Sequence, residues 1–181
     1  MGDILTYFDH ITLAMEKIAE NEKVIFLGQC VGYPGNALFR NLEKIDKSRR
    51  IEMPVIEDLQ MGISIGLALN GFIPVTIYPR FDFLVLAGNQ LINHLDKFSG
   101  MSGGRVKPKV IIRVCVGSTS PLHPGVQHCS DHTYAFSHLL KNTEVIKLEK
   151  SEQIIPSYMK ALERIDGQST VLVELADLYK T

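Results

Sequence analysis

The chain has 181 residues, 45% of them hydrophobic, which suffices for one sizeable core, so we expect a single domain over residues 1–181. Its 19 basic and 20 acidic side chains give a formal net charge of −1, which favours neither nucleic acid nor an anionic membrane as a partner. No apolar run reaches the roughly 18 residues of a membrane span, the N-terminus lacks the pattern of a signal peptide, and the three cysteines lack CxxC spacing, so we expect a cytoplasmic protein.

Short apolar or β-branched runs alternate along the chain with segments of helical periodicity. The strand-like runs, each expected to be buried on both faces, are 24–28, 50–53, 73–78, 109–116, 144–148 and 170–175. The helical segments are 4–20, 36–44, 57–70, 83–98, 131–141 and 151–165. We expect the first of these helices to bury a stripe made of Leu5, Phe8, Thr12, Met15 and Ala19.

This alternation predicts an α/β fold with a doubly wound, mostly parallel six-stranded sheet and helices on both faces. In such folds the ligand crevice lies beyond the carboxyl ends of the strands. Three motifs that often occupy that crevice are missing: the sequence contains no GxxxxGK[ST], no GxGxxG after the first strand and no GxSxG. Nucleotide hydrolysis, dinucleotide binding and α/β-hydrolase chemistry therefore lose their usual support.

The segment from Met53 to Gly71 turns at Pro54 and then begins a helix whose first turn holds Glu57 and Asp58. By themselves these carboxylates could simply compensate the helix dipole, an effect of roughly 0.3–1 kcal/mol. The helix is unusual in alternating small residues with apolar ones, and such a helix is expected to pack tightly on nearly every side.

The run IEMPVIEDLQMGISIGLALNGFIPVTIYPRFDF resembles the pyrimidine-binding domain of the transketolase family, and is most similar to the beta subunits of 2-oxo acid dehydrogenase decarboxylase components. The resemblance extends from about residue 5 to residue 179 and includes the later segments MSGG (101–104) and GVQHCSDH (125–132). The family positions matched in the first run are Pro54, Glu57, Gly62, Gly66, Gly71, Pro74, Phe81 and Phe83.

The resemblance implies a thiamine diphosphate-binding fold and a role for Glu57. In the family, a glutamate at this position hydrogen-bonds a ring nitrogen of the aminopyrimidine, which makes the cofactor's own amino group an internal base. The carboxyl needs a sheltered, apolar site, for which Val55, Ile56, Phe81 and Phe83 are suitable walls. Phe81 and Phe83 would point the same way from an extended segment, with Phe83 on the pyrimidine face, although both could also be plain core residues.

The histidines His123, His128 and His132 lie close together in the sequence with Cys129, but their spacing fits no common structural zinc site, so we predict no metal held by this chain. The resemblance gives His128 a catalytic role, in contact with substrate or stabilising the charged intermediate; exposed loop polarity is the alternative. Gln29 and Cys30 follow the first strand and could face the substrate, and related subunits often carry glutamate there.

The family binds the cofactor's diphosphate through Mg²⁺ at a Gly-Asp-Gly motif, which this chain lacks. The resemblance therefore implies a separate alpha-type subunit that carries Gly-Asp-Gly and Mg²⁺, in a dimer or an alpha2beta2 tetramer, and substrates that are 2-oxo acids or ketose phosphates. Beta subunits of the family continue into a C-terminal domain that we do not expect here. The alternatives are a non-catalytic scaffold or dimerisation subunit that kept the fold, and an unrelated flavodoxin-like ligand-binding domain.

Overall fold

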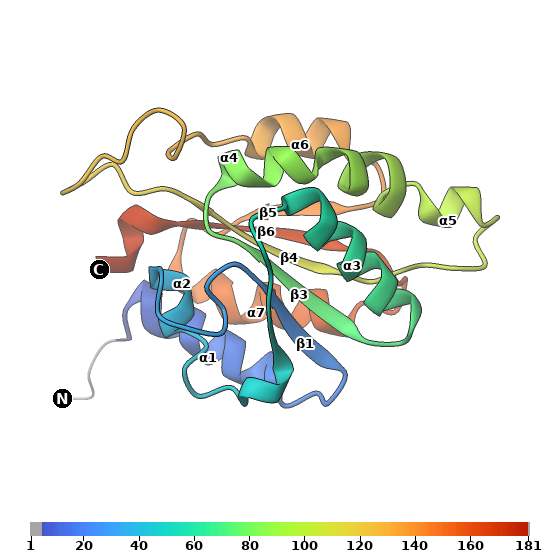
Figure 1. Cartoon of the computed structure of the whole chain (residues 1–181), viewed down its shortest axis with the longest axis horizontal. Coiled ribbons are helices and arrows are strands. Elements are labelled where there is room, and N and C mark those ends of the chain that lie inside the picture. The colour runs from blue at the N-terminus through green and yellow to red at the C-terminus, as the bar shows by residue number, and fades with distance from the viewer. Residues whose placement is uncertain (1–4, 181) are drawn as a thin grey trace.

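A computed structural model of the chain, which describes residues 5–180, confirms the α/β fold (Figure 1). One sheet has the strand order β2-β1-β3-β4-β6-β5, and every neighbouring pair is parallel. The strands are β1 (Val24–Gly28), β2 (Arg50–Glu52), β3 (Ile73–Tyr78), β4 (Ile111–Val116), β5 (Glu144–Lys147) and β6 (Thr170–Leu175). β1, β3 and β6 have the predicted bounds, and the other three are slightly shorter than predicted.

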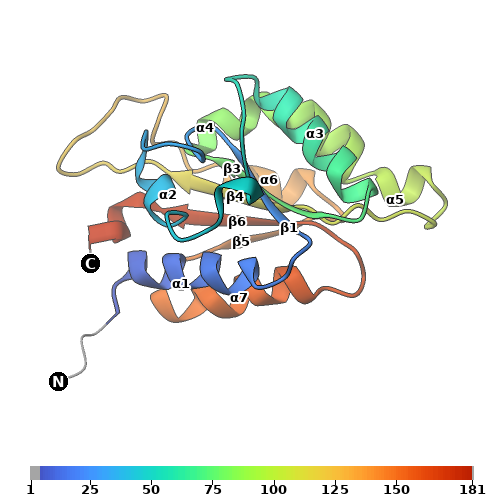
Figure 2. The same ribbon diagram turned by 60° about the horizontal axis from the view of Figure 1, so that its bottom comes forward.

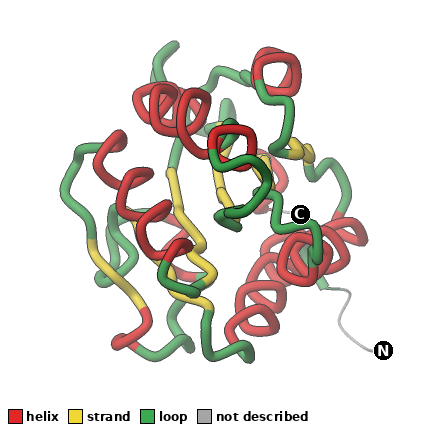
Figure 3. Tube along the Cα trace, turned by 90° about the vertical axis from the view of Figure 1, so that its right-hand side faces the viewer, coloured by secondary structure: helices red, strands yellow, loops and turns green. Residues whose placement is uncertain are grey.

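Helices cover both faces of the sheet, as the end-on view in Figure 3 shows. α1 (Tyr7–Ala19) and α7 (Ser151–Glu163) lie side by side on one face, and α3 (Glu57–Leu69), α4 (Phe81–Leu84) and α6 (Thr133–Leu139) lie on the other. The remaining short helices are α2 (Ala37–Arg40), η1 (Lys47–Arg49), η2 (Val85–Ala87), η3 (Asn89–Leu95), α5 (Phe98–Met101) and η4 (Ala176–Lys180). Between residues 5 and 180, no helix has both the length and the apolarity needed to cross a bilayer.

The two helical layers explain why the strands are apolar at nearly every position. Successive side chains of a strand point to opposite faces. In β3, Ile77 packs in the cluster beside α1 and α7, whereas its neighbour Tyr78 packs in the cluster beside α3 and α6. In β4, Ile111 and Ile112 divide in the same way. Because both faces are covered, a polar residue in a central strand needs a buried partner.

The first helix buries a different stripe from the one predicted. Its inward residues are Tyr7, Ile11, Ala14, Met15 and Ile18, so of the predicted stripe only Met15 is among them. The helix begins at Tyr7 because Thr6 caps it: the Thr6 hydroxyl accepts from the Asp9 backbone N–H at 3.1 Å. The Tyr7 hydroxyl then donates to the Leu148 carbonyl at 2.7 Å, which turns the Tyr7 edge of the helix inward.

Two other predicted helices differ from the structure. The expected helix 36–44 is only the single turn α2, whose first N–H groups are capped by the Asn36 side chain. The expected regular helix 83–98 begins earlier, at Phe81, and changes its winding from α to 3₁₀ to π before α5. Its buried residues are spaced by three and then by four positions: Phe81, Leu84, Ala87, Leu91 and Leu95. The tight and then wide winding keeps this stripe on the core.

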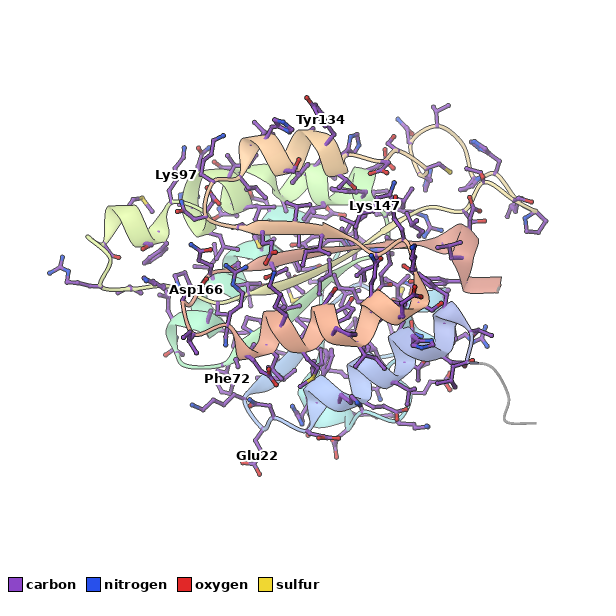
Figure 4. All side chains as sticks on the ribbon, turned by 180° about the vertical axis from the view of Figure 1, so that it is seen from behind. Glu22, Phe72, Lys97, Tyr134, Lys147 and Asp166 are labelled. Atoms are coloured by element: carbon purple, nitrogen blue, oxygen red, sulfur yellow. The ribbon has the colours of Figure 1, made fainter. Side chains whose placement is uncertain are left out.

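Helix α3 is packed on one side only, contrary to the expectation of contacts on nearly every side. Met61 and Ile65 are buried against the sheet and α4. Leu59 and Ile63 are 44% and 36% exposed, and apart from the two neighbouring residues and the backbone of its own helix, no atom of the described chain lies within 4 Å of a Cβ added at Gly66. These three positions share one helical face. Phe72, which follows the end of α3 and is labelled in Figure 4, is also 40% exposed.

Candidate functional site

Glu57 is the first residue of α3 and follows β2 after a turn at Pro54. Its side chain is only 5% exposed, and its Oε1 accepts a hydrogen bond from Gln29 Nε2 at 3.0 Å. Gln29 follows β1, the neighbour of β2, so the parallel pairing brings the two residues together at the carboxyl edge of the sheet. Among residues 5–180, Glu57 Oε2 has no hydrogen-bond partner. One carboxyl oxygen is thus held, and the other is available to a ligand.

The loop after β1 owes its shape to Glu52, the last residue of β2. Its carboxylate accepts the backbone N–H groups of Cys30, Val31 and Gly32 at 2.7–2.9 Å. Cys30 has a left-handed φ of 55°, and its sulfur lies where any side chain at Gly35 would be. The three hydrogen bonds to Glu52 hold the loop in a sharp turn and thereby position Gln29 beside Glu57. The sequence offered no signal for Glu52 beyond a charge at a strand end.

Phe81 and Phe83 do not point the same way, because residues 81–84 are helical rather than extended. Phe81 is fully buried against Phe136, with ring centroids 5.2 Å apart, so the structure does not offer its ring to a ligand. Phe83 is half-buried and meets the ring of His128 edge-on, with centroids 5.5 Å apart and an interplanar angle of 79°. Of the two predicted contacts, only Phe83 lies at the carboxyl edge with an accessible ring.

His128 is held in the long loop that follows β4. A Cβ at Gly117 would lie 1.9 Å from the His128 carbonyl oxygen, so only glycine permits the loop to pass so closely. Asp82 accepts the Ser130 backbone N–H at 3.2 Å and lies 3.6 Å from His132 Nε2. Burial opposes ionisation of Asp82, but donation from Ser130 outweighs it and keeps the pKa of this carboxyl below its usual value. Asp82 therefore ties the loop to α4.

The other candidate residues from the sequence do not join Glu57 in one site within this chain. Val55 and Ile56 are 75% and 51% exposed, so they do not wall the site within this chain. The described part of the chain contains no group of three or more histidine, cysteine or acidic residues arranged to hold a metal ion. His123 is exposed, and its Nδ1 accepts the Gly125 N–H at 3.1 Å.

Two buried polar residues of the site region were not recognised in the sequence. Gln60, on α3, donates from Nε2 to Thr76 Oγ1 at 2.9 Å and to the Ile77 carbonyl at 3.0 Å. The Tyr78 hydroxyl donates to the Glu57 carbonyl at 3.4 Å. These three hydrogen bonds tie the start of α3 to β3. A glutamine in an otherwise small and apolar helix is the signal that could have found the first of them.

The site thus consists of two residue pairs, Gln29 with Glu57 and Phe83 with His128, in loops that follow β1, β2, β3 and β4. No family model matches the chain. The beta subunit of the pyruvate dehydrogenase E1 component from Mesostigma viride is 31% identical over 110 residues, 59% of this chain and 34% of that protein. The 2-oxoisovalerate dehydrogenase beta subunit from Bacillus subtilis is 26% identical over 149 residues, 80% of this chain and 44% of that protein.

The resemblance to transketolase-like pyrimidine-binding domains is confirmed. A solved structure of the inactive beta4 tetramer of a split-gene transketolase matches 96% of this chain and 52% of that chain, with a TM-score of 0.72 and 18% identity, which supports the fold. The chain spans less than half the length of the dehydrogenase beta subunits that it matches.

Proposed function

We propose that the chain is the pyrimidine-binding subunit of a two-subunit thiamine diphosphate-dependent enzyme that acts on a 2-oxo acid or a ketose phosphate. One observation carries the proposal: a buried carboxyl, Glu57, stands at the carboxyl edge of the sheet with Oε1 held by Gln29 and Oε2 open. The half-buried ring of Phe83 supplies an aromatic surface at the same edge. A carboxyl and an aromatic face are the groups that suit an aminopyrimidine.

Thiamine diphosphate, when bound, would stabilise negative charge at the substrate's carbonyl carbon while the bond to the neighbouring carbon is broken. The part played by Glu57 is to hold a proton on Oε2 at a ring nitrogen of the pyrimidine. Gln29 orients this carboxyl, since its N–H occupies Oε1 and leaves Oε2 to carry the proton. Phe83 would pack on the pyrimidine, and His128, which borders Phe83, would face the substrate.

The diphosphate and Mg²⁺ would be held by a separate alpha-type subunit with a Gly-Asp-Gly motif, because this chain has no such motif. The uncovered face of α3 is the surface that fits such a partner. Its apolar residues, together with those of the neighbouring η2, are 36–63% exposed: Leu59, Ile63, Leu69, Val85 and Leu86. An apolar patch of this kind on two adjacent elements is typical of an interface.

Reconstitution tests the proposal. The chain is mixed with Gly-Asp-Gly subunits encoded in the same genome, and cofactor binding is measured by calorimetry with Mg²⁺, followed by assays of 2-oxo acid decarboxylation and ketol transfer. We expect cofactor binding and turnover only in the mixed assembly. Tight cofactor binding by the chain alone would contradict the division of the site between subunits. An assembly that forms without turnover would favour the scaffold alternative.

Replacing Gln29 with methionine should lower the turnover number of the assembled enzyme by roughly twofold to tenfold, with a smaller change in the substrate KM, because a hydrogen bond between uncharged groups contributes roughly 0.5–1.5 kcal/mol. The matched control is Gln90→Met. Gln90, on η3, donates at 3.3 Å to Asp58, which follows Glu57 on α3. Steady-state kinetics of both variants check the prediction. Equal turnover in the two variants would show that Gln29 does not orient Glu57 for catalysis.

Replacing Ile63 with glutamate should weaken assembly with the partner at least about a hundredfold, because a charge would be buried in an apolar contact. Ile63 is 36% exposed in the single chain, so the variant should fold. Ile165→Glu is the control, since Ile165 is fully exposed at the opposite edge of the sheet. Size-exclusion chromatography with light scattering measures assembly. Unchanged assembly of the Ile63 variant would show that the partner binds elsewhere.

A further inference from the structure

Helix α3 lies over the sheet on the face opposite α1 and α7, as Figure 2 shows, and begins at Glu57 without a side-chain cap. Ile56 occupies the N-cap position and forms no capping hydrogen bond. In α1, by contrast, the N-cap residue Thr6 accepts from the Asp9 N–H. A capping side chain normally fixes the first turn of a helix. The turn that carries Glu57 must therefore be held by another element.

The element that holds this turn is β3. Gln60 of α3 and Thr76 and Tyr78 of β3 are polar but completely buried. The Tyr78 hydroxyl donates to the Glu57 carbonyl at 3.4 Å. One turn further along α3, Gln60 Nε2 donates to Thr76 Oγ1 at 2.9 Å and to the Ile77 carbonyl at 3.0 Å. Two polar anchors, one turn apart, therefore join the start of α3 to a central strand of the sheet.

The donor and acceptor roles in this network are fixed. The Ile77 carbonyl can only accept a hydrogen bond, so the Gln60 amide must face it with Nε2. Burial raises the pKa of the Tyr78 hydroxyl far above its ordinary value, and a hydrogen bond with Thr76 offsets only part of this rise. Tyr78 therefore stays protonated at neutral pH and donates to the Glu57 carbonyl.

Stability alone gives no reason for a glutamine at position 60. The side chain is completely buried, and its Oε1 has no hydrogen-bond partner among residues 5–180. A buried polar atom without a partner lowers stability, so an apolar side chain of similar length, such as methionine, would pack here at less cost. Met61, the next residue, is such a buried methionine on the same helix. The glutamine therefore contributes something that an apolar residue would not.

That contribution is direction, which hydrogen bonds have and apolar contacts lack. Besides Glu57 and Gln60, the buried residues of α3 are Met61, Ser64 and Ile65. The Ser64 hydroxyl donates within the helix, to the Gln60 carbonyl at 2.8 Å. Apolar packing alone would let the helix rotate or slide on the sheet, whereas two anchors one turn apart fix both its rotation and its height. This precision matters because a displacement of about 1 Å at a reacting group can cost about a hundredfold in rate.

We propose that Gln60 and Tyr78 are positioning residues, which hold the first turn of α3 on β3 so that the Glu57 carboxyl keeps its place beside Gln29. Both act through Glu57: Tyr78 bonds its carbonyl, and Gln60 anchors the turn that Glu57 begins. The consequence for catalysis rests on the proposed function. The control that β3 exerts on the position of Glu57 does not.

The first test uses the full chain alone, labelled with ¹³C and ¹⁵N for NMR. Tyr78→Phe removes only a hydroxyl. Ser64→Ala is the matched control, because its hydroxyl is equally buried on α3 but bonds the Gln60 carbonyl of its own helix. We expect Tyr78→Phe to shift the carbonyl resonance of Glu57 and the side-chain amide resonances of Gln29, which donates to Glu57 at 3.0 Å. Ser64→Ala should leave both unchanged, and unshifted resonances in Tyr78→Phe would overturn the inference.

The second test is a double-mutant cycle in the mixed assembly. Each hydrogen bond lost, one in Tyr78→Phe and two in Gln60→Met, should lower the turnover number roughly twofold to tenfold, with a smaller change in the substrate KM. In a Glu57→Gln background the same replacements should have almost no further effect, because residues that act only through Glu57 lose their influence with it. Ser64→Ala should keep near-normal turnover.

The possible failures point to different conclusions. If the wild-type assembly is active but the losses add fully in the Glu57→Gln background, Gln60 and Tyr78 have only a general structural role, and the proposed function stands without this inference. A wild-type assembly without turnover would instead contradict the proposed function, and the resonances of the chain alone would still decide whether β3 positions Glu57. Tyr78→Phe, which keeps the ring, decides the matter if Gln60→Met fails to fold.

Discussion

Replacing Glu57 with glutamine should leave the fold intact and lower the turnover number of the assembled enzyme by about a hundredfold to ten-thousandfold, the usual contribution of a positioned acid or base. Glutamine has the shape of glutamate, and its carbonyl can still accept the N–H of Gln29, which lies 3.0 Å from Oε1. Its amide group can donate a hydrogen bond but cannot transfer a proton. Only the proton transfer is lost.

The measurements are the turnover number, the affinity for the cofactor and the thermal unfolding midpoint. Asp58→Asn is the matched control, because Asp58 lies in the same first turn but contacts Gln90 instead of Gln29. The control should keep near-normal turnover, and both variants should unfold at about the same temperature as the wild type. A Glu57→Gln enzyme with turnover like that of the control would refute the assignment of Glu57.

Replacing Glu174 with leucine should lower the free energy of unfolding by about 3–5 kcal/mol, because the Arg113 charge would be left unpaired in the core. Arg113 and Glu174 are both fully buried in neighbouring strands, β4 and β6, with Nε to Oε1 at 2.8 Å and Nη2 to Oε2 at 3.0 Å. The Tyr158 and Tyr179 hydroxyls also donate to Glu174, and Arg113 reaches Asn41 at 2.7 Å. The network joins α2, β4, β6, α7 and η4.

Urea unfolding followed by circular dichroism measures this effect. The double variant Arg113→Met with Glu174→Leu should recover much of the loss, since it removes both buried charges together. The pair of exposed Lys44 and half-buried Glu16, 2.9 Å apart at the surface, is the control, and its loss should cost less than about 1 kcal/mol. A Glu174→Leu variant as stable as the wild type would show that the pair contributes nothing net.

The strands and the start of α3 were predictable from the sequence because they depend on the periodicity of neighbouring residues. Runs such as 73–78 and 170–175 are apolar at nearly every position, which indicates strands covered on both faces, and their bounds agree with the structure. Pro54 and the acidic pair after it marked the start of α3 at Glu57. The resemblance over several segments of the sequence indicated the family, and the comparisons bear this out.

The site was predictable only in part. Glu57, Gln29, Phe83 and His128 lie at the carboxyl edge where parallel strands place such residues, but their catalytic roles stay predictions. Phe81 was paired with Phe83 on the assumption of an extended segment, and the helical turn at 81–84 sends Phe81 into the core instead. Whether four residues form a helical turn or an extended segment depends on the residues they pack against. Those residues lie elsewhere in the chain, so a short stretch of sequence does not reveal them.

The sequence by itself determined the six strands, the position of α3 and the residue that begins it, because strand and helix periods are properties of neighbouring residues. Only the tertiary structure decided which face of α1 is buried, that Arg113 in the middle of an apolar strand meets Glu174 sixty-one positions away, and that Gln60 and Tyr78 join α3 to β3. Parallel strands in the order β2-β1-β3-β4-β6-β5 bring together loops that lie far apart along the chain, and contacts between such loops carry no local signature.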